Sequence, residues 1–200
     1  MQPSHEKKDD ILNAAGGCFA RYGFEKTTMD DIGRAVGLNK ASLYYYFNNK
    51  EAIFTEVIFQ EREKYLKNLI ERTNREKNRR DQIAAYMVGR YRFVFDYLNL
   101  HNLSSEILLR IRPFFFNLYE SVVNIEIDLV KNFIEQGIEG KEFRACDAKR
   151  IAASIITVCD AIKQRECVSS ELKKVKEYDN ERIEEEIAFI CSLILDGIKR

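Results

Sequence analysis

The chain has 200 residues, of which 46% are hydrophobic and 32% are charged. This length and composition indicate an ordinary globular protein of one or two domains, which can bury a sizeable core without disulfides or metals. The 32 basic side chains balance the 32 acidic ones, so the net charge argues neither for nor against a nucleic-acid partner.

Cysteine usage and hydropathy indicate the cellular compartment of the protein. The 5 cysteines are scattered without any CxxC spacing, and most are interpreted as small hydrophobic residues in a reducing cytoplasm. No run approaches the roughly 18 apolar residues that a membrane-spanning helix needs, and the start "MQPSHEKKDD" lacks the apolar stretch of a signal peptide. We therefore expect a soluble, cytoplasmic protein with no membrane partner.

The spacing of apolar residues predicts the fold class. Apolar residues recur at helical spacing almost throughout, while strand-like alternation is rare, so we predict an all-α fold of about nine helices. They are expected at about residues 7–22, 29–37, 40–47, 50–75, 81–99, 104–111, 113–137, 147–165 and 180–199. Pro113 suits a first helical position, where its missing N–H is no loss. The polar segment 166–179 is expected to be a loop with a partial helix.

Local signals mark the ends of the first helices. Gly23 supplies the left-handed residue that ends the first helix, and Gly37 ends the second. Thr28 with Asp31 three residues later resembles a capping box for the second helix. Asn39 is a good N-cap for the third helix. Two short helices separated by a three-residue turn that contains glycine form a helix-turn-helix.

The third predicted helix carries "SLYYYF" at residues 42–47. Leu43 and Phe47 are four residues apart and must face inward, which leaves Tyr45 and parts of Tyr44 and Tyr46 facing outward. An exposed aromatic ridge needs a partner. The alternative is that the tyrosines cover a small core with their hydroxyls in water.

Residues 9–58 resemble the DNA-binding domain of the TetR (tetracycline-repressor) family of bacterial regulators. The resemblance rests on "ILNAA", "CFARYGFEKTTMDDI", "AVGLNKASLYYYF" and "NKEAIF" at the right mutual spacing. Gly16, Gly17 and Gly33 depart from the family pattern. The resemblance implies a helix-turn-helix DNA-binding domain in residues 1–50 and a ligand-binding and dimerisation domain in residues 51–200.

The same resemblance assigns a DNA-binding surface. Its implied phosphate contacts are Thr28, Tyr44, Tyr46 and Lys50. Its implied base readers in the major groove are Lys40, Ala41, Ser42 and Tyr45, with Lys40 able to donate to guanine O6 or N7. One lysine on the reading surface is few, so we expect much of the affinity to come from two copies of the domain and from DNA shape.

The last two helices carry more apolar surface than a surface helix needs. Residues 147–165 have the stripe Ile151, Ile155, Val158 and Ile162 beside the stripe Ala152, Ile156 and Cys159. The second stripe suits a subunit interface, and the family resemblance implies a homodimer through the last two helices. Burial of both stripes inside one monomeric core is the alternative.

Eight aromatic residues lie between positions 91 and 119. Such a stripe is more often core than ligand site, but the family resemblance implies an effector cavity among these helices. We expect a small, largely apolar effector, with ligand-binding residues Phe93, Tyr97, His101, Phe115 and Tyr119. His101, Asn117 and Arg110 are the candidate polar contacts.

The sequence contains few of the residue patterns that indicate an enzyme. The only two histidines are His5 and His101, so no histidine metal cluster or Ser/His/Asp constellation can be built, and no glycine pattern cradles a phosphate. We predict a regulator without cofactor or metal, a repressor that leaves a near-palindromic operator when its effector shifts the fourth helix. The alternative is a helix-turn-helix protein that acts as a protein-interaction module without specific DNA binding.

Overall fold

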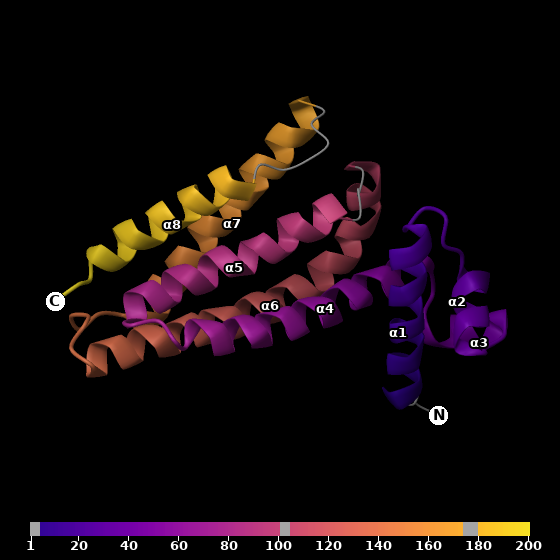
Figure 1. Cartoon of the computed structure of the whole chain (residues 1–200), viewed down its shortest axis with the longest axis horizontal. Helices are drawn as coiled ribbons and strands as arrows, with labels where there is room; N and C mark the ends of the chain where they lie inside the picture. The colour runs from indigo at the N-terminus through magenta and orange to yellow at the C-terminus, as the bar shows by residue number, and fades with distance from the viewer. Residues whose placement is uncertain (1–4, 101–104, 174–179) are drawn as a thin grey trace. The chain divides into compact units, whose positions relative to one another are not determined.

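The structure is a computed structural model that describes residues 5–100, 105–173 and 180–200. In this part of the chain there are eight α-helices and no β-sheet, which confirms the predicted all-α class (Figure 1). The helices are α1 (His5–Tyr22), α2 (Met29–Val36), α3 (Lys40–Tyr46), α4 (Lys50–Thr73), α5 (Arg79–Leu100), α6 (Ser105–Glu139), α7 (Ala148–Lys173) and α8 (Asn180–Asp196).

The difference from nine expected helices lies at Pro113. The helices expected at 104–111 and 113–137 form the single helix α6, with Pro113 inside it. A proline inside a helix removes one backbone hydrogen bond, but the helical pattern continues on both sides and the helix persists. Helix α7 extends to Lys173, so the partial helix expected within segment 166–179 is present at residues 166–173.

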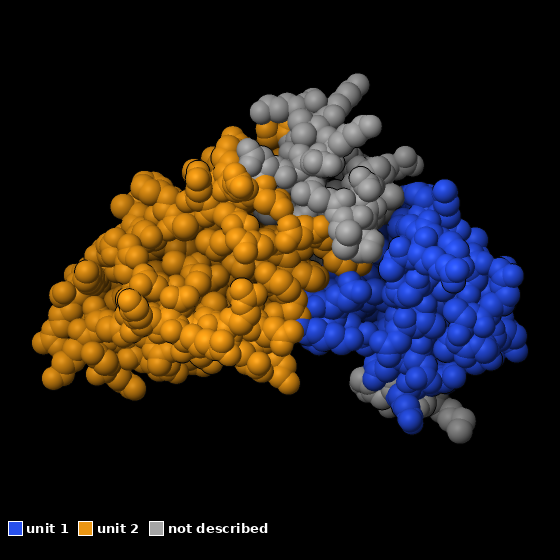
Figure 2. Space-filling model, viewed as in Figure 1, with its two compact units in different colours: residues 1–64, 103–117 blue, residues 65–102, 118–200 orange. Residues whose placement is uncertain are grey.

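The chain forms two compact units (Figure 2). Unit 1 comprises residues 1–64 and 103–117, and unit 2 comprises residues 65–102 and 118–200. Helices α4 and α6 contribute residues to both units. The functional boundary at residue 50 remains a prediction.

Unit 1 has a small aromatic core around α1. Ile11, Ala15 and Phe19 are buried on one face of this helix. The Phe19 ring meets Phe54 of α4 edge to face with the ring centroids 4.9 Å apart, and the ring of Phe24 lies 4.6 Å from that of Phe54. Burying a side chain of this size contributes about 1.5 to 3 kcal/mol, so these contacts hold α2 and α3 on a stable base.

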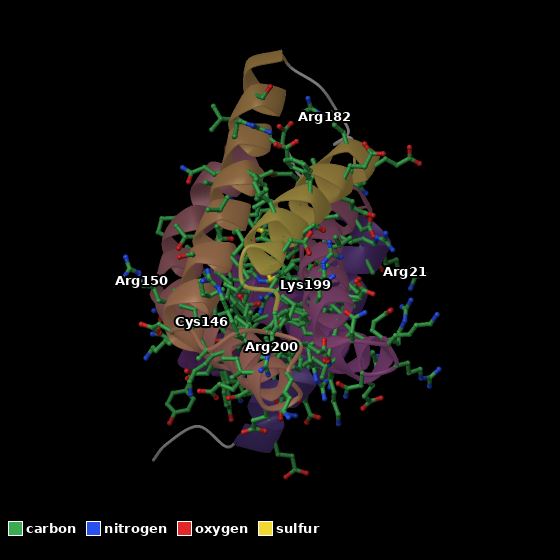
Figure 3. All side chains as sticks on the ribbon, turned by 90° about the vertical axis from the view of Figure 1, so that its left-hand side faces the viewer. Arg21, Cys146, Arg150, Arg182, Lys199 and Arg200 are labelled. Carbon is green, nitrogen blue, oxygen red and sulfur yellow. The ribbon has the colours of Figure 1, made fainter. Side chains whose placement is uncertain are left out.

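Unit 2 has a larger core, built mainly of aliphatic side chains with some aromatic ones, to which α4, α5, α6, α7 and α8 contribute. Its members include Ile83, Met87, Val130, Ile134, Ile155, Ile187, Cys191 and Leu195. Figure 3 shows carbon-rich side chains filling the space between these helices, while Arg150 extends outward from α7.

The two apolar stripes of α7 are used differently from the prediction. Ala152, Ile156 and Cys159, expected to remain for a subunit interface, are at most 1% exposed within the single chain. Helix α8 covers them, since the Cys159 sulfur lies 3.9 Å from that of Cys191. Of the other stripe, Val158 is 38% exposed.

A cluster of charged side chains is buried in unit 2. The Arg90 guanidinium of α5 lies 2.5 Å from the Glu126 carboxylate of α6 and 3.5 Å from the Asp160 carboxylate of α7. The Tyr91 hydroxyl donates to Asp160 at 2.8 Å. Because buried charges are tolerated only when they are paired, this cluster fixes the mutual register of three helices.

Candidate nucleic-acid interface

The start of α2 has the predicted capping box. The backbone N–H of Asp31 donates to the Thr28 hydroxyl oxygen at 3.2 Å, and the Thr28 N–H donates to the Asp31 carboxylate at 3.0 Å. These bonds satisfy two N–H groups that the first turn of a helix leaves without intrahelical partners. The pKa of the Asp31 carboxyl is lowered, chiefly because the Thr28 hydroxyl donates to this carboxylate, and further by the Thr28 N–H and by Arg34.

The turn between α2 and α3 is tight. Gly37 ends α2 in the left-handed conformation with φ 70°, and the Leu38 N–H donates to the Gly33 carbonyl at 2.8 Å. A Cβ at position 33 would lie 2.9 Å from the Leu38 carbonyl oxygen. This close approach explains why glycine stands at position 33, one of the departures from the family pattern.

Helix α3 sits on the core through two residues. Asn39 caps the helix by accepting from the Ser42 N–H at 2.8 Å. Leu43 is 0% exposed and Phe47 is 3% exposed, as the four-residue spacing predicts. Anchoring these two positions determines which of the other side chains face the solvent.

The outward face of α3 carries most of the predicted contact residues. Tyr45 is 58% exposed and Tyr44 is 43% exposed, while Tyr46 is half-buried and meets the Tyr45 ring edge to face at 5.3 Å. Lys40 and Ala41 are exposed beside them, and Ser42 is partly exposed. Of the six predicted α3 residues, four are therefore exposed and two, Ser42 and Tyr46, are partly buried.

The two remaining predicted contacts have partners within unit 1. The Thr28 hydroxyl donates to the Asp31 carboxylate at 2.6 Å. The Lys50 ammonium donates to the carbonyl of Phe24 at 2.7 Å and lies 4.4 Å from the centre of the Phe24 ring. Burial lowers the pKa of Lys50, against the opposing effect of the Glu25 and Glu51 carboxylates. The same ammonium also donates to the Glu25 carbonyl at 3.3 Å, which leaves one of its three N–H groups beyond these two bonds.

Sequence reasoning missed two ion-pair sites in this unit. The Lys40 ammonium lies 3.3 Å from the Asp30 carboxylate of α2. The Arg110 guanidinium, at the beginning of α6, pairs with Glu51 of α4 and lies 3.4 Å from Glu25. These partners are 10 to 85 positions apart in the chain, so no local sequence signal could have revealed them.

Some of the predicted effector residues lie in the described part of unit 2. The Phe93 ring is 5.7 Å from that of Tyr97 and 5.2 Å from that of Tyr65. His101 and the side chains of Phe115 and Tyr119 lie outside the described residues. Arg110, a candidate polar contact for the effector, pairs with the acidic residues Glu25 and Glu51 of unit 1.

A group of large apolar side chains is exposed on the last two helices. Val158 and Val168 of α7 are 38% and 47% exposed, and Phe189 and Leu193 of α8 are 63% and 61% exposed. We call these four residues the α7–α8 apolar face. Scattered single apolar residues are normal on a protein surface, but two large ones four positions apart on α8 share one side of the helix.

Two other kinds of site are absent from the described ranges. There, no helix is long and apolar enough to cross a bilayer. The same residues contain no group of three or more His, Cys, Asp or Glu side chains placed to hold a metal ion.

Comparisons with known proteins place this geometry in a family. Residues 11–57 match the model of "Bacterial regulatory proteins, tetR family". The chain is 30% identical over 145 residues to the "Biofilm operon icaADBC HTH-type negative transcriptional regulator IcaR" of Staphylococcus aureus, covering 67% of this chain and 71% of that protein. The chain belongs to the tetR family. It is a transcriptional regulator with a DNA-binding helix-turn-helix and not an enzyme.

Further relatives agree with this assignment to the tetR family. The IcaR of Staphylococcus epidermidis is 43% identical over 51 residues, covering 26% of this chain and 28% of that protein. A solved transcriptional regulator from Cytophaga hutchinsonii matches with a TM-score of 0.77 at 29% identity, covering 95% and 97% of the two chains. A putative tetR-family regulator from Mesorhizobium loti matches in fold, with a TM-score of 0.65, 16% identity and complete coverage of both chains.

Proposed function

We propose that the protein is a dimeric repressor that binds a near-palindromic operator through α2 and α3 and is released by a small, largely apolar effector. Its place of action is the cytoplasm, where bacterial DNA lies. The observation that carries the DNA-binding part is the exposed polar and aromatic face of α3, held outward by two fully buried anchors.

The α3 surface suits a duplex because each exposed group has a chemical counterpart there. Lys40, Ala41, Ser42 and Tyr45 are the proposed base readers, and Thr28, Tyr44, Tyr46 and Lys50 are the proposed phosphate contacts. Tyrosine hydroxyls and ammonium groups donate to phosphate oxygens, which sets the register, while base edges in the major groove give the sequence preference. The exposed tyrosines, which would otherwise leave aromatic surface in water, are covered in this arrangement.

Repression is favoured by the named relatives. IcaR of Staphylococcus aureus is a negative regulator of a biofilm operon, and it is similar to this chain over 145 residues, or 67% of the chain. Repression needs only occupancy of an operator that overlaps a promoter. The present chain carries the same helix-turn-helix segment, so the simplest mechanism is steric block of transcription.

Dimerisation is proposed to use the α7–α8 apolar face. An isologous contact pairs this face with its copy, covers all four exposed apolar side chains and presents two α3 helices to two half-sites. A second copy is the fitting occupant because a single set of α3 residues offers only Lys40 as a basic base reader. Two half-sites double the base contacts and account for the near-palindromic operator.

The effector is proposed to bind beside aromatic residues between positions 93 and 119. Phe93, Tyr97, His101, Phe115 and Tyr119 are its proposed contacts. The neighbouring Phe93 and Tyr97 rings offer apolar faces with a polar hydroxyl at one end, which suits a ligand with a largely apolar body.

Coupling between effector and operator is proposed to run through α4 and α6, because residues of both helices belong to both units. Within unit 1, Lys50 at the start of α4 holds the Phe24 carbonyl, and Arg110 of α6 pairs with Glu51. A shift of either helix therefore moves the loop that precedes α2. Ligand and DNA then oppose each other with a coupling of about 1 to 3 kcal/mol.

The test is binding of the purified protein to the intergenic DNA beside its own gene and to a random duplex library, measured by mobility shift with excess nonspecific competitor. Lys40→Ala and Tyr44→Phe should each weaken a competitor-resistant shift by about tenfold or more, as loss of one base or phosphate contact does. Tyr22→Phe is the matched control, because Tyr22 is 49% exposed on α1 but outside α2 and α3.

The alternative of a protein-interaction module predicts a different result. Without specific DNA binding, no duplex from the library survives competitor, and any residual binding disappears as salt is raised. That outcome would reject the repressor proposal. Once a specific shift is found, apolar compounds that abolish it and also raise the thermal midpoint of the protein identify the effector class.

A further inference from the structure

We propose that Asp30 is a specificity-determining residue that reads one G·C pair in each half-site together with Lys40. In this arrangement the Lys40 ammonium donates to the guanine and the Asp30 carboxylate accepts from cytosine N4. The inference rests on the proposed function, since it requires that α2 and α3 bind duplex DNA.

The two side chains join across the turn of the helix-turn-helix. Asp30 lies in the first turn of α2 and Lys40 is the first residue of α3. The Lys40 Nζ and Asp30 Oδ2 atoms are 3.3 Å apart, and the two side chains are 59% and 57% exposed. They border a shallow depression that is also lined by Gly33, Arg34, Leu38 and Asn39. A donor and an acceptor are thus presented side by side at the beginning of the proposed reading helix.

Fold stability does not explain this pair. An ion pair between side chains that are more than half exposed contributes little to folding, because water screens both charges. The neighbouring acid has a different role, since Asp31 caps α2 and pairs with Arg34. A carboxylate on a DNA-facing surface also repels phosphates and weakens nonspecific binding. Asp30 therefore contributes to binding only where the DNA offers a hydrogen-bond donor.

The major-groove edge of a G·C pair fits this pair of side chains. Its groups run in the order guanine N7 acceptor, guanine O6 acceptor and cytosine N4 donor, whereas an A·T pair runs acceptor, donor, acceptor. Lys40 can donate to both guanine acceptors while Asp30 accepts from the adjacent cytosine amine. On an A·T pair, the same placement brings the adenine amine against Lys40 or the thymine oxygen against Asp30.

The distances agree with this arrangement. Guanine O6 and cytosine N4 are hydrogen-bonded to each other in the base pair, so they are about 2.9 Å apart. The Lys40 Nζ and Asp30 Oδ2 atoms are separated by 3.3 Å. Both contacts can therefore be made to one base pair without breaking the ion pair, and each side chain holds the other in the reading position.

The first experiment selects duplexes from a random library with the full-length protein and sequences them. The wild type should enrich a motif with one G·C pair per half-site whose exchange for A·T weakens binding by about tenfold, the size of one lost base contact. Asp30→Ala should retain the rest of the motif and lose that preference. The matched control is Asp10→Ala, which removes an equally exposed, ion-paired acid from α1. Asp30→Ala should also gain a small factor in affinity for random DNA, because it removes a carboxylate from the proposed DNA-facing surface, whereas Asp10→Ala should gain less.

The second experiment separates base contact from positioning of Lys40. In N4-methylcytosine, one N4 hydrogen still pairs with guanine and a methyl group replaces the hydrogen that faces the major groove. Placing it at the selected pair should weaken wild-type binding by about tenfold and leave Asp30→Ala unaffected.

Each other outcome overturns the inference in a recognisable way. A wild type that enriches no motif refutes the proposed DNA-binding function and this inference with it. A motif that Asp30→Ala leaves unchanged refutes the inference alone. Loss of the preference in Asp30→Ala, with a wild type that tolerates N4-methylcytosine, shows that Asp30 only positions Lys40.

Discussion

Unit 1 fixes its helix ends with short-range hydrogen bonds at the surface, whereas unit 2 joins three helices through charged groups in its interior. The Thr28–Asp31 and Asn39–Ser42 contacts each span three residues. The Tyr91–Asp160 contact spans 69 residues and lies beside the buried Arg90. The ends of α2 and α3 therefore depend on interactions that water largely screens. The packing of helices in unit 2 depends on buried interactions that water cannot replace.

The largest expected effect comes from the buried cluster. Arg90→Met keeps most of the side-chain volume but removes the buried cation that pairs with Glu126, while Asp160 keeps its ion pair with Lys163, so the free energy of unfolding should fall by about 3 to 5 kcal/mol. Arg92→Ala on the same helix is the control, because its pair with Glu184 is partly exposed and should contribute about 1 kcal/mol or less. Urea unfolding measures both. Equal effects would remove the proposed contrast between buried and exposed pairs.

The next effect concerns the outer surface of unit 2. Leu193→Asp places a charge in the proposed dimer contact, where burial without a partner should raise the dimer dissociation constant by about a hundredfold, or about 2.7 kcal/mol. Ile125→Asp is the matched control, since Ile125 is 69% exposed on α6, outside the α7–α8 apolar face. Sedimentation equilibrium should find a dimeric wild type and control and a monomeric Leu193→Asp. A monomeric wild type would reject the dimer proposal.

Within unit 1, replacing two different glycines by alanine should change the free energy of unfolding in opposite directions. Gly33→Ala puts a methyl group 2.9 Å from a backbone oxygen, so it should lower the free energy of unfolding by about 1 to 2 kcal/mol and weaken operator binding. In Gly17→Ala, the new methyl group in the middle of α1 meets no atom within 4 Å. This change should raise the free energy of unfolding by about 0.5 to 1 kcal/mol. Thermal and urea unfolding of the two variants measure both changes in the free energy of unfolding. A stabilising Gly33→Ala would mean that the turn can relax.

The smallest effect is the pH dependence of the α2 cap. Hydrogen bonds from Thr28 hold the folded-state pKa of Asp31 below its usual value of 3.8. The stability contribution of the ionised Asp31 is therefore present above about pH 4 and is lost as the pH falls through the folded-state pKa. Unfolding free energies of the wild type and Asp31→Asn should differ at pH 6 and converge towards pH 2.5. A difference that stays constant over this range would contradict the assigned role of the carboxylate.

The accuracy of the sequence predictions follows the same division between the units. The caps at Thr28 and Asn39 and the left-handed Gly23 were predicted correctly because each signal lies within a few residues of the helix end that it fixes. The inward positions Leu43 and Phe47 follow from helical spacing alone. The ion pair of Lys40 with Asp30 could not be predicted, since it depends on how one helix crosses the next.

Unit 2 was predicted at the level of helices and less well at the level of surfaces. Periodicity identified the apolar stripes of α7, but it could not say which neighbour covers each stripe, and Ala152 and Cys159 proved to be covered within the chain. The continuous α6 was divided at Pro113 because a proline is a strong local stop signal. The surrounding helical context overrides that signal.

The sequence by itself determined the all-α class, the helix-turn-helix and its caps, because periodicity, capping and turn chemistry act over a few residues. Only the tertiary structure decided that Gly33 meets the Leu38 carbonyl, that Asp30 stands beside Lys40 and that Arg90, Glu126 and Asp160 share one buried cluster. Such contacts depend on the crossing of helices that are distant in the chain, and no short window of sequence specifies that crossing.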